Sequence, residues 1–322
     1  MQYDFKSSFS VDLNRFIEQK KSLGRSYRTF DRYLVRFDSM CAAQYPDASE
    51  LTQEIVMQWA VKNASECNNT LRNRMSSIRE FARFLVRDGK SAYIIPSGLV
   101  RKSPRYMPHI FTKKEISEIW AAFDALEPVP NSQSRHLVLA AVVRLLYCCG
   151  LRPIEVRRLK ISDVDLSAGS LFIRESKGHK DRIVMMSHDL ADYIRRYDTK
   201  ICKIFPYREY FFPGTTGGFS ADGWFNRNWG IVRSNLKFNA ICGNLPRLYD
   251  LRHTFATHRL YEWMHEGKDL NAMLPYLSAY MGHAQLSDTY YYIHHIPDQF
   301  KKMTGIDFSR YEELLPEVEY DE

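Results

Sequence analysis

The sequence of 322 residues has few cysteines and no long apolar run. Its six cysteines show neither metal-ligand spacing nor the density of a disulfide-stapled fold, so we expect reduced packing residues. The most apolar run, 137–149, is short and contains Arg144, which argues against a membrane-spanning helix. The N-terminus lacks the apolar centre of a signal peptide. These absences exclude a disulfide-rich secreted domain and a membrane protein, and they predict a cytoplasmic protein.

Motifs for binding metals and nucleotides are also missing. His253 and His258, like His294 and His295, lack a zinc pattern such as H-E-x-x-H, and we interpret them as packing or surface residues. The run G-T-T-G-G at 214–218 lacks the Gly-Lys-Ser/Thr ending of a phosphate loop and predicts a plain turn. There are no internal repeats or low-complexity tracts. The sequence therefore predicts neither a metal nor a nucleotide cofactor.

What the chain does have is positive charge. Its net charge is +7, and residues 1–112 hold 18 Lys and Arg against 11 Asp and Glu. Residues 307–322 are acidic, with seven Asp and Glu and a single Arg. The length accommodates two domains, each with its own core. A basic two-domain protein suggests a polyanionic partner, although charge alone does not decide it.

The first hundred residues predict only helices, from apolar residues at helical spacing. We expect helices at 11–23, 29–45, 52–62 and 68–88. The last combines an apolar stripe with arginines that are predicted to face outward, where they could lie against DNA. A solvated basic face is the alternative. The candidate DNA-binding residues in this helix and after it are Arg72, Arg74, Arg79, Arg83, Arg101, Lys102 and Arg105.

A stretch rich in proline and basic residues then predicts a linker at 101–111. It separates a domain at 1–100 from a second domain at 112–306, which the acidic tail at 307–322 follows. Thr112 and Glu115 form a capping-box pattern at the start of a helix. Two β-rich runs, S-L-F-I-R-E-S and R-I-V-M-M-S, flank K-G-H-K-D and predict a hairpin. The expected fold is mainly α with a small antiparallel sheet.

Two arginines stand where helices should begin, a position at which the helix dipole disfavours a cation. Arg152 lies between Gly150, which closes one helix, and Pro153, which suits the first position of the next. Arg252 follows Asp250, a candidate cap. A bound phosphodiester would resolve both conflicts, because a guanidinium fork binds two phosphate oxygens. Surface arginines with solvated side chains are the alternative.

These arginines belong to a longer series of motifs, and the series resembles the catalytic domain of the tyrosine recombinase, or phage integrase, family. The family pattern is Arg after Gly-Leu, Lys in a β-hairpin, His-x-x-Arg, Gly-His, and Tyr nine residues after that His. The matching positions are Arg152, Lys177, Tyr249-x-x-Arg252, Gly282-His283 and Tyr292. The resemblance implies a two-domain protein of the Xer and integrase type, with a helical DNA-clamping, SAM-like domain at 1–100 and a catalytic domain at 112–306.

The resemblance also implies a chemistry. Tyr292 would attack a DNA phosphodiester and leave a 3′-phosphotyrosyl link and a free 5′-hydroxyl, with no metal or nucleotide cofactor. Arg152 and Arg252 would stabilise the charge that gathers in the transition state. Lys177 would protonate the leaving 5′ oxygen. His283 would donate a hydrogen bond to the phosphate.

One position departs from the family pattern, because Tyr249 stands where the family usually has histidine. A phenol is a poor base near neutral pH but an adequate donor, so we predict that it contacts the scissile phosphate; a packing tyrosine is the alternative. Tyr290 and Tyr291 compete with Tyr292, but neighbours on a helix point about 100° apart, and the spacing favours Tyr292. Glu155 would orient neighbouring groups, or form an ordinary helix salt bridge.

The function that we predict is a site-specific DNA recombinase: an integrase or transposase of a mobile element, or a resolvase. It would act as a homo-tetramer on double-stranded DNA with specific core sites. The C-terminal segment would dock on a neighbouring subunit, and a related recombinase or an accessory protein could take part. The alternatives are a strand nicker like the type IB topoisomerases and a DNA-binding accessory protein with a decayed site.

Overall fold

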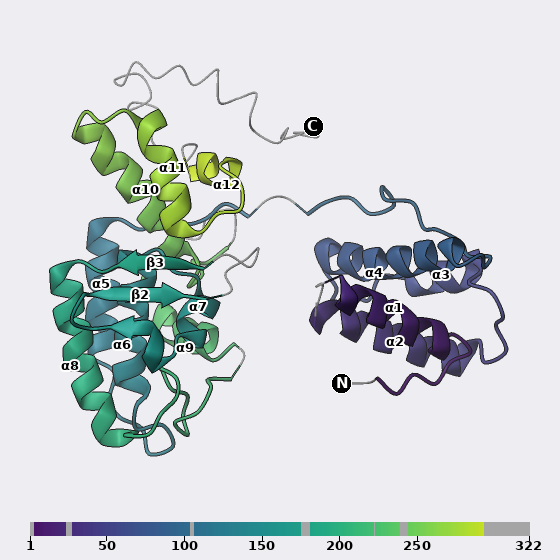
Figure 1. Cartoon of the computed structure of the whole chain (residues 1–322), viewed down its shortest axis with the longest axis horizontal. Coiled ribbons are helices and arrows are strands. Elements are labelled where there is room, and N and C mark those ends of the chain that lie inside the picture. Colours follow the sequence, from purple (N-terminus) through teal and green to yellow (C-terminus); the bar gives the residue numbers. More distant parts are fainter. Residues whose placement is uncertain are drawn as a thin grey trace. The chain divides into compact units, whose positions relative to one another are not determined.

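The computed structural model describes residues 3–23, 28–103, 106–174, 181–221, 223–238 and 244–292. The chain divides into two units, Met1–Tyr106 and Met107–Glu322 (Figure 1). The division falls inside the stretch 101–111 in which the sequence predicts a linker. Each unit contains a buried hydrophobic core of its own.

The N-terminal unit is helical throughout its described residues. Its elements are α1 (Ser10–Ser22), α2 (Arg28–Gln44), α3 (Gln53–Trp59) and α4 (Asn68–Arg87). Phe16, Phe37 and Phe81 are fully buried among them, and the ring centroids of Phe16 and Phe81 lie 5.6 Å apart. The four predicted helices are therefore confirmed, and apolar residues at helical spacing form their common core.

One arginine of α4 does not face outward. Arg74 is 3% exposed, and its Nη2 lies 2.8 Å from the Glu66 carboxylate. The guanidinium also donates to the backbone oxygens of Trp59 and Val61 and lies 4.6 Å from the Trp59 ring centroid. The prediction that Arg74 belongs to a DNA-facing surface is wrong, because a carboxylate and two carbonyls from the preceding segment hold it inside.

The second unit is mainly helical, with a small sheet (Figure 1). Thr112 caps α5, and the predicted capping box with Glu115 is present. The strands form an antiparallel sheet in the order β1-β2-β3, with Leu171 opposite Val184. The predicted fold class is confirmed. The described elements are α5 (Lys113–Asp124), α6 (Arg135–Cys148), α7 (Pro153–Arg158), the 3-10 turn η1 (Ile161–Asp163), β1 (Val164–Asp165), β2 (Ser170–Ile173), β3 (Arg182–Met185), α8 (His188–Ile204), α9 (Trp224–Ser234), α10 (Asp250–His265), α11 (Leu270–Met281) and α12 (Ser287–Tyr290).

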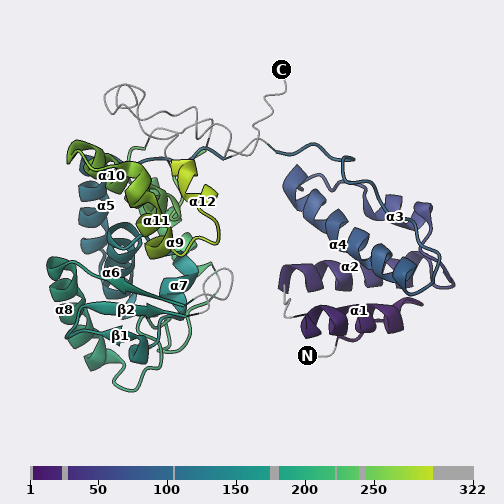
Figure 2. The same cartoon turned by 45° about the horizontal axis from the view of Figure 1, so that its top comes forward.

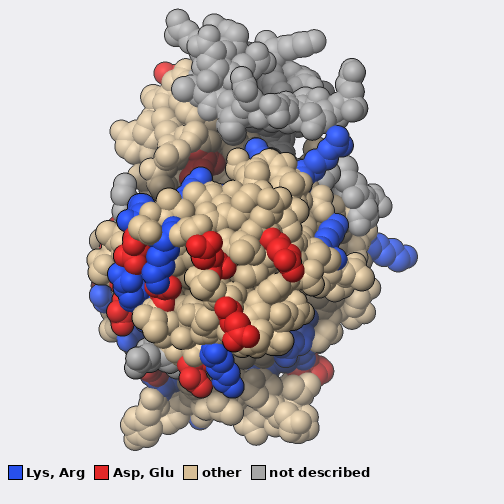
Figure 3. All heavy atoms as spheres, turned by 90° about the vertical axis from the view of Figure 1, so that its right-hand side faces the viewer, with Lys and Arg blue, Asp and Glu red and all other residues tan. Residues whose placement is uncertain are grey.

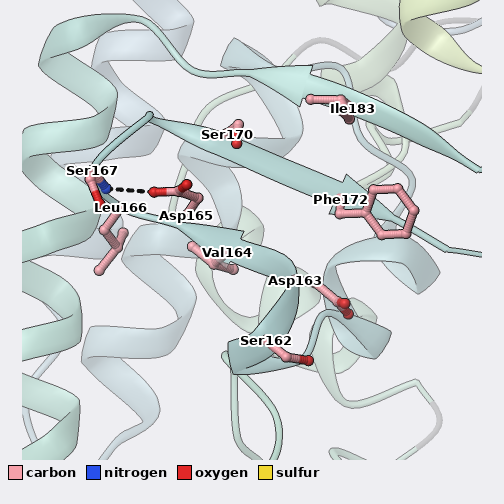
Figure 4. A pocket seen from close by; sticks show the side chains of 9 residues that line it. All are labelled: Ser162, Asp163, Val164, Asp165, Leu166, Ser167, Ser170, Phe172 and Ile183. Atoms are coloured by element: carbon pink, nitrogen blue, oxygen red, sulfur yellow. Dashed lines mark hydrogen bonds between the residues drawn. The ribbon is translucent and has the colours of Figure 1, made fainter.

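The sheet has one buried and one exposed face. Leu171 and Val184 point into the core, whereas Ile183 and Met185 are exposed. A pocket on the exposed side is lined by residues of η1, the three strands and the β1–β2 turn, Phe172 and Ile183 among them (Figure 4). No candidate catalytic residue lines this pocket, so it is not the site that the sequence predicts.

The last three helices form a second core in this unit. α10, α11 and α12 lie side by side in Figures 1 and 2, and Leu260, Leu274, Leu277 and Tyr292 are buried between them. The end of α11 also contacts β3. This packing brings the end of α11 close to the sheet and to the start of α10. No helix in the described ranges is long and apolar enough to cross a membrane.

Candidate active site

Arg152 stands at the N-cap of α7, as the sequence predicts. Gly150 lies between α6 and α7 and has a φ of 58°, and Pro153 is the first residue of α7. The backbone N–H of Arg152 donates to the Glu155 carboxylate at 2.8 Å, and its Nη1 donates to the same group at 2.7 Å. Its Nη2 donates to the Gly282 carbonyl at 3.0 Å. The side chain is thus folded back over the helix start and held at the end of α11.

Arg252 lies in the first turn of α10 and is fully buried. Its Nη2 donates to the Met281 carbonyl at 2.7 Å, and its Nη1 donates to the Gly150 carbonyl. Burial and the nearby charge of Arg152 lower the pKa of Arg252. The two arginines therefore bind consecutive carbonyls, those of residues 281 and 282. They meet in one place although a hundred residues separate them in the sequence.

The predicted cap of α10 has a different role. Tyr249, not Asp250, is the N-cap residue, and it makes no side-chain cap bond. The Asp250 carboxylate instead accepts the backbone N–H of Arg247 at 2.9 Å. Because its partner precedes the helix, Asp250 fixes the turn that leads into α10 rather than the first N–H groups of the helix.

His283 follows Gly282, whose φ of 66° ends α11. Its Nε2 lies 3.0 Å from Arg252 Nη2, and its Nδ1 lies 2.7 Å from the Thr289 hydroxyl. A guanidinium only donates, so Nε2 accepts in this arrangement and Nδ1 carries the proton. Burial and the charges of Arg252 and Arg152 lower the pKa of His283 to about 3. The imidazole is therefore neutral at any working pH.

Tyr292 is the buried member of the three consecutive tyrosines, at 3% exposure. Its ring stacks on that of His283 with centroids 5.8 Å apart and lies 5.5 Å from the ring of His253. Burial raises its pKa to about 12, although the Arg252 charge opposes this. The predicted nucleophile is thus protonated at neutral pH and lies beside the paired arginines.

Tyr249 lies at the solvent edge of this cluster. It is 37% exposed, and its ring packs edge-on against His253 with centroids 5.2 Å apart. Its phenol lies close enough to Tyr292 and to Arg252 for an electrostatic interaction with each. Tyr249 thus lies at the cluster and packs on His253, and its contact with a phosphate stays a prediction.

Glu155 joins two arginines, only one of which the sequence analysis considered. Its carboxylate accepts from Arg152 and also from both terminal nitrogens of Arg182, each at 2.9 Å. Although burial acts in the opposite direction, these bonds and charges lower its pKa to about 2. The signal for Arg182 was its place at the start of a strand directly after the predicted hairpin turn. Lys177 itself lies outside the described residues.

The remaining basic candidates lie on and near α4. Arg72 donates to the Val100 carbonyl at 2.9 Å, and Arg79 donates to the Ile95 and Pro96 carbonyls at 2.7 and 2.8 Å. Burial, followed by the charges of Arg83 and Arg72, lowers the pKa of Arg79, so these three cations are close together.

Beyond α4, Arg101 and Lys102 are exposed, and Arg105 lies outside the described residues. The surface is not uniformly basic: on the side of the chain drawn in Figure 3, acidic side chains lie among the basic ones. No group of three or more His, Cys, Asp or Glu within the described ranges could hold a metal ion.

Sequence comparisons with known proteins point to one family. The model of the phage integrase family matches residues 109–298. The y4rB protein of Sinorhizobium fredii is 30% identical over 305 residues, which cover 92% of this chain and 96% of that one. A tyrosine recombinase of Pseudothermotoga lettingae is 31% identical over 262 residues, 79% of this chain and 80% of that one.

The fold has a close counterpart among solved structures. The Tn1549 transposon integrase in complex with circular intermediate DNA covers 91% of this chain and 98% of its own, with a TM-score of 0.63 and 14% sequence identity. At this identity the likeness establishes the fold.

Proposed function

The chain belongs to the phage integrase family of tyrosine recombinases, and from that premise we propose how its residues cleave and rejoin DNA. It is a site-specific recombinase, an enzyme that cuts and joins DNA strands. The observation that carries the proposal is the convergence of Arg152 and Arg252 on neighbouring carbonyls beside the buried Tyr292. A phosphodiester would take the place of those carbonyls.

In the proposed reaction, the Tyr292 oxygen attacks the scissile phosphorus while the bond from phosphorus to the 5′ oxygen breaks. The phenol releases its proton to solvent water, and Lys177 gives a proton to the leaving 5′ oxygen. The product is a 3′-phosphotyrosyl link and a free 5′-hydroxyl. In the rejoining step, this hydroxyl attacks the phosphotyrosyl link on a partner strand and releases the tyrosine. One phosphoester replaces another at each step, so the reaction consumes no nucleotide cofactor.

The arginines stabilise the charge of the pentavalent transition state. Once each has exchanged its carbonyl for a phosphate oxygen on DNA binding, little further reorganisation is needed when charge develops on the non-bridging oxygens. Arg252 and Arg152 each offer Nη2, the nitrogen that donates to a carbonyl at the C-terminal end of α11. Phosphate oxygens are stronger acceptors than carbonyls, because the hydrogen bond is charge-assisted on both sides.

His283 changes partners when the phosphate binds. Once Arg252 Nη2 turns to the phosphate, His283 Nε2 loses its donor, and the Thr289 hydroxyl can switch from accepting to donating at Nδ1. The proton then resides on Nε2, which donates to the phosphate. Tyr249 donates a further hydrogen bond from the solvent edge, and as a phenol it is a poor base near neutral pH.

We assign the recognition of the DNA backbone to the basic residues of the N-terminal unit. Burial, followed by the charges of Arg83 and Arg72, lowers the pKa of Arg79, and a polyanion would offset the part that comes from these neighbouring cations. Arg101, Lys102 and Arg105 extend this surface along the linker. Arg74 is not part of it.

The assembly that fits this chemistry is a homo-tetramer on two duplexes with specific core sites, in the cytoplasm. The segment after Tyr292 would dock on the neighbouring subunit; it lies outside the described residues. The natural context would be a mobile element that integrates or transposes, or a resolution system, with or without a related recombinase or accessory protein.

The proposal is tested by capturing covalent complexes in cells that carry the gene. The chain is purified under denaturing conditions, and the DNA that stays attached is sequenced, which also identifies the target site. We expect wild-type protein and the Tyr291→Phe control to carry DNA through a 3′ end, and Tyr292→Phe to carry none.

Two outcomes would overturn the assignment. An adduct on Tyr292→Phe protein would mean another nucleophile. Attachment by wild-type protein to a single duplex without strand exchange would instead favour a topoisomerase-like nicker.

A further inference from the structure

Three consecutive carbonyls at the end of α11 each bind a different arginine. The Tyr280 carbonyl accepts Arg182 Nε at 2.8 Å, the Met281 carbonyl accepts Arg252 Nη2 at 2.7 Å, and the Gly282 carbonyl accepts Arg152 Nη2 at 3.0 Å. The last carbonyls of a helix lack intrahelical donors and carry partial negative charge. The end of α11 is thus an acceptor site for three guanidinium groups at once.

Arg182 connects this helix end to Glu155. Its Nε binds the end of α11, while Nη1 and Nη2 form a fork with the Glu155 carboxylate, and its side chain is 8% exposed. The same carboxylate holds Arg152 by its backbone and by its side chain. The Arg182 side chain therefore links α7 to the end of α11. These are the two elements that hold the Arg152 side chain in place.

The contact with the helix end is close-packed. A Cβ on Gly282 would lie 2.7 Å from Arg182 Nη1, and the positive φ of Gly282 already disfavours any side chain there. The turn that presents His283 is therefore packed directly against the Arg182 guanidinium.

We propose that Arg182 is a positioning residue of the strand-transfer reaction, which holds Arg152 and the Gly282-His283 turn at the spacing the transition state needs. The inference rests on the proposed function. Arg182 does not touch the phosphate in this account; it acts through Glu155 and the end of α11. Each of its three nitrogens donates to one of these two partners, in a fork geometry that lysine cannot reproduce.

The experiment measures single-turnover cleavage of a nicked duplex that carries the captured target site. Arg182→Gln removes the charge, and Arg182→Lys keeps the charge but not the fork. We expect both variants to cleave about 100-fold more slowly than wild type, the loss typical of a small displacement of catalytic groups. Their affinity for the duplex should stay within a few-fold, because Arg182 does not contact DNA in this account. Wild-type rates in either variant would overturn the proposal.

A second substrate separates positioning from loss of folded protein. A methylphosphonate at the scissile position removes one charged non-bridging oxygen, so correct placement of both guanidiniums matters less. The defect of the Arg182 variants should shrink at least tenfold on this substrate. If Arg182 only supports the fold, both substrates lose the same factor, and the proposal fails.

Two controls complete the test. Arg208→Gln removes a buried arginine that pairs with Asp198 on α8, and we expect it to slow both substrates equally or not at all. A duplex with sulfur at the leaving 5′ position needs no proton from Lys177. If sulfur alone restored the Arg182 variants, Arg182 would instead serve Lys177, and the proposal would be wrong. If wild-type protein formed no covalent complex, the proposed function itself would fail.

Discussion

Both units of the chain bury arginines, but they balance the buried charge differently. In the N-terminal unit, Arg74 has the Glu66 carboxylate for itself, at 2.8 Å. In the second unit, Glu155 is the carboxylate shared by Arg152 and Arg182, whereas Arg252 donates to two backbone carbonyls and contacts the His283 imidazole. The N-terminal unit pairs its buried Arg74 with an anion, whereas the described residues at the end of α11 gather three arginines around the single Glu155 carboxylate.

The comparison teaches how to tell a structural arginine from a functional one. Both kinds donate to backbone carbonyls, so the number of hydrogen bonds does not separate them. The charge count does, because a surplus of buried cations is costly unless an anion arrives to offset it. By this criterion Arg74 supports the fold, whereas Arg152 and Arg252 are the arginines that would bind a phosphate and Arg182 positions them.

The largest difference between the two kinds of arginine is expected in the cleavage rate of an Arg252 variant. We expect Arg252→Gln to slow single-turnover cleavage by at least about 1000-fold, or ~4 kcal/mol, because a preorganised donor to the transition state is lost. The same measurement on Arg74→Gln, scaled to the folded fraction, should give the wild-type rate. Equal losses in the two variants would remove the distinction.

The free energy of unfolding should depend more on Arg74 than on Arg252. Arg74→Gln leaves Glu66 buried without its cation, and we expect a loss of about 3 to 4 kcal/mol in the free energy of unfolding. Denaturant unfolding of the N-terminal core reports this value. A loss below about 1 kcal/mol would mean that Arg74 is not the structural arginine of the comparison.

The misplacement of Arg74 shows what sequence patterns capture and what they miss. Helical spacing predicted α1 to α4 to within a few residues, since each helix buries one apolar stripe. The same spacing could not reveal that Glu66, in the loop before α4, draws an arginine inward. A pairing between a loop and a helix depends on chain path, which periodicity does not encode.

Lowering the pH should remove the stability that the charged Glu155 contributes to the second unit. Its folded pKa of about 2 lies below the ordinary value, so the stability it contributes is present above about pH 4.5 and is lost as pH falls towards 2. Glu155→Gln protein lacks this contribution. We expect the difference in unfolding free energy from wild type, on the order of 3 kcal/mol at pH 7, to shrink over that range. A difference independent of pH would contradict the charged carboxylate.

Tyr249 tests whether the second unit lacks a neutral-range base. Tyr292 is protonated and His283 already neutral at pH 6 to 9, so the wild-type cleavage rate should rise with pH across this range. Tyr249→His should add a group that titrates near pH 6.5 and make the rate level off above it, with a gain of a few-fold at pH 7. A variant much slower than wild type would argue against the proposed role of Tyr249.

The smallest effect is expected at the surface of the N-terminal unit. Arg83→Gln should weaken DNA binding a few-fold and lower the slope of log affinity against log salt by about 1, because one phosphate contact is lost. The exposed Arg32 on α2, replaced in the same way, serves as the matched control with no expected change. An unaltered salt slope would remove Arg83 from the DNA-facing surface.

The site was readable from sequence only where motifs carry it. The order and spacing of Arg152, Arg252, His283 and Tyr292 predicted residues that the fold does bring together. Arg182 was missed, because its partners lie 27 and 98 residues away and no local pattern marks them. Its function depends on α11 ending beside β3, a property of packing rather than of sequence.

The most direct test of the charge surplus is a structure of Tyr292→Phe protein on a duplex that carries the captured site. The account predicts that Arg152 and Arg252 leave the carbonyls of residues 281 and 282 and bind the same scissile phosphate, with the ring of residue 292 beside it. Guanidiniums that stay on those carbonyls, or bind separate phosphates, would contradict it.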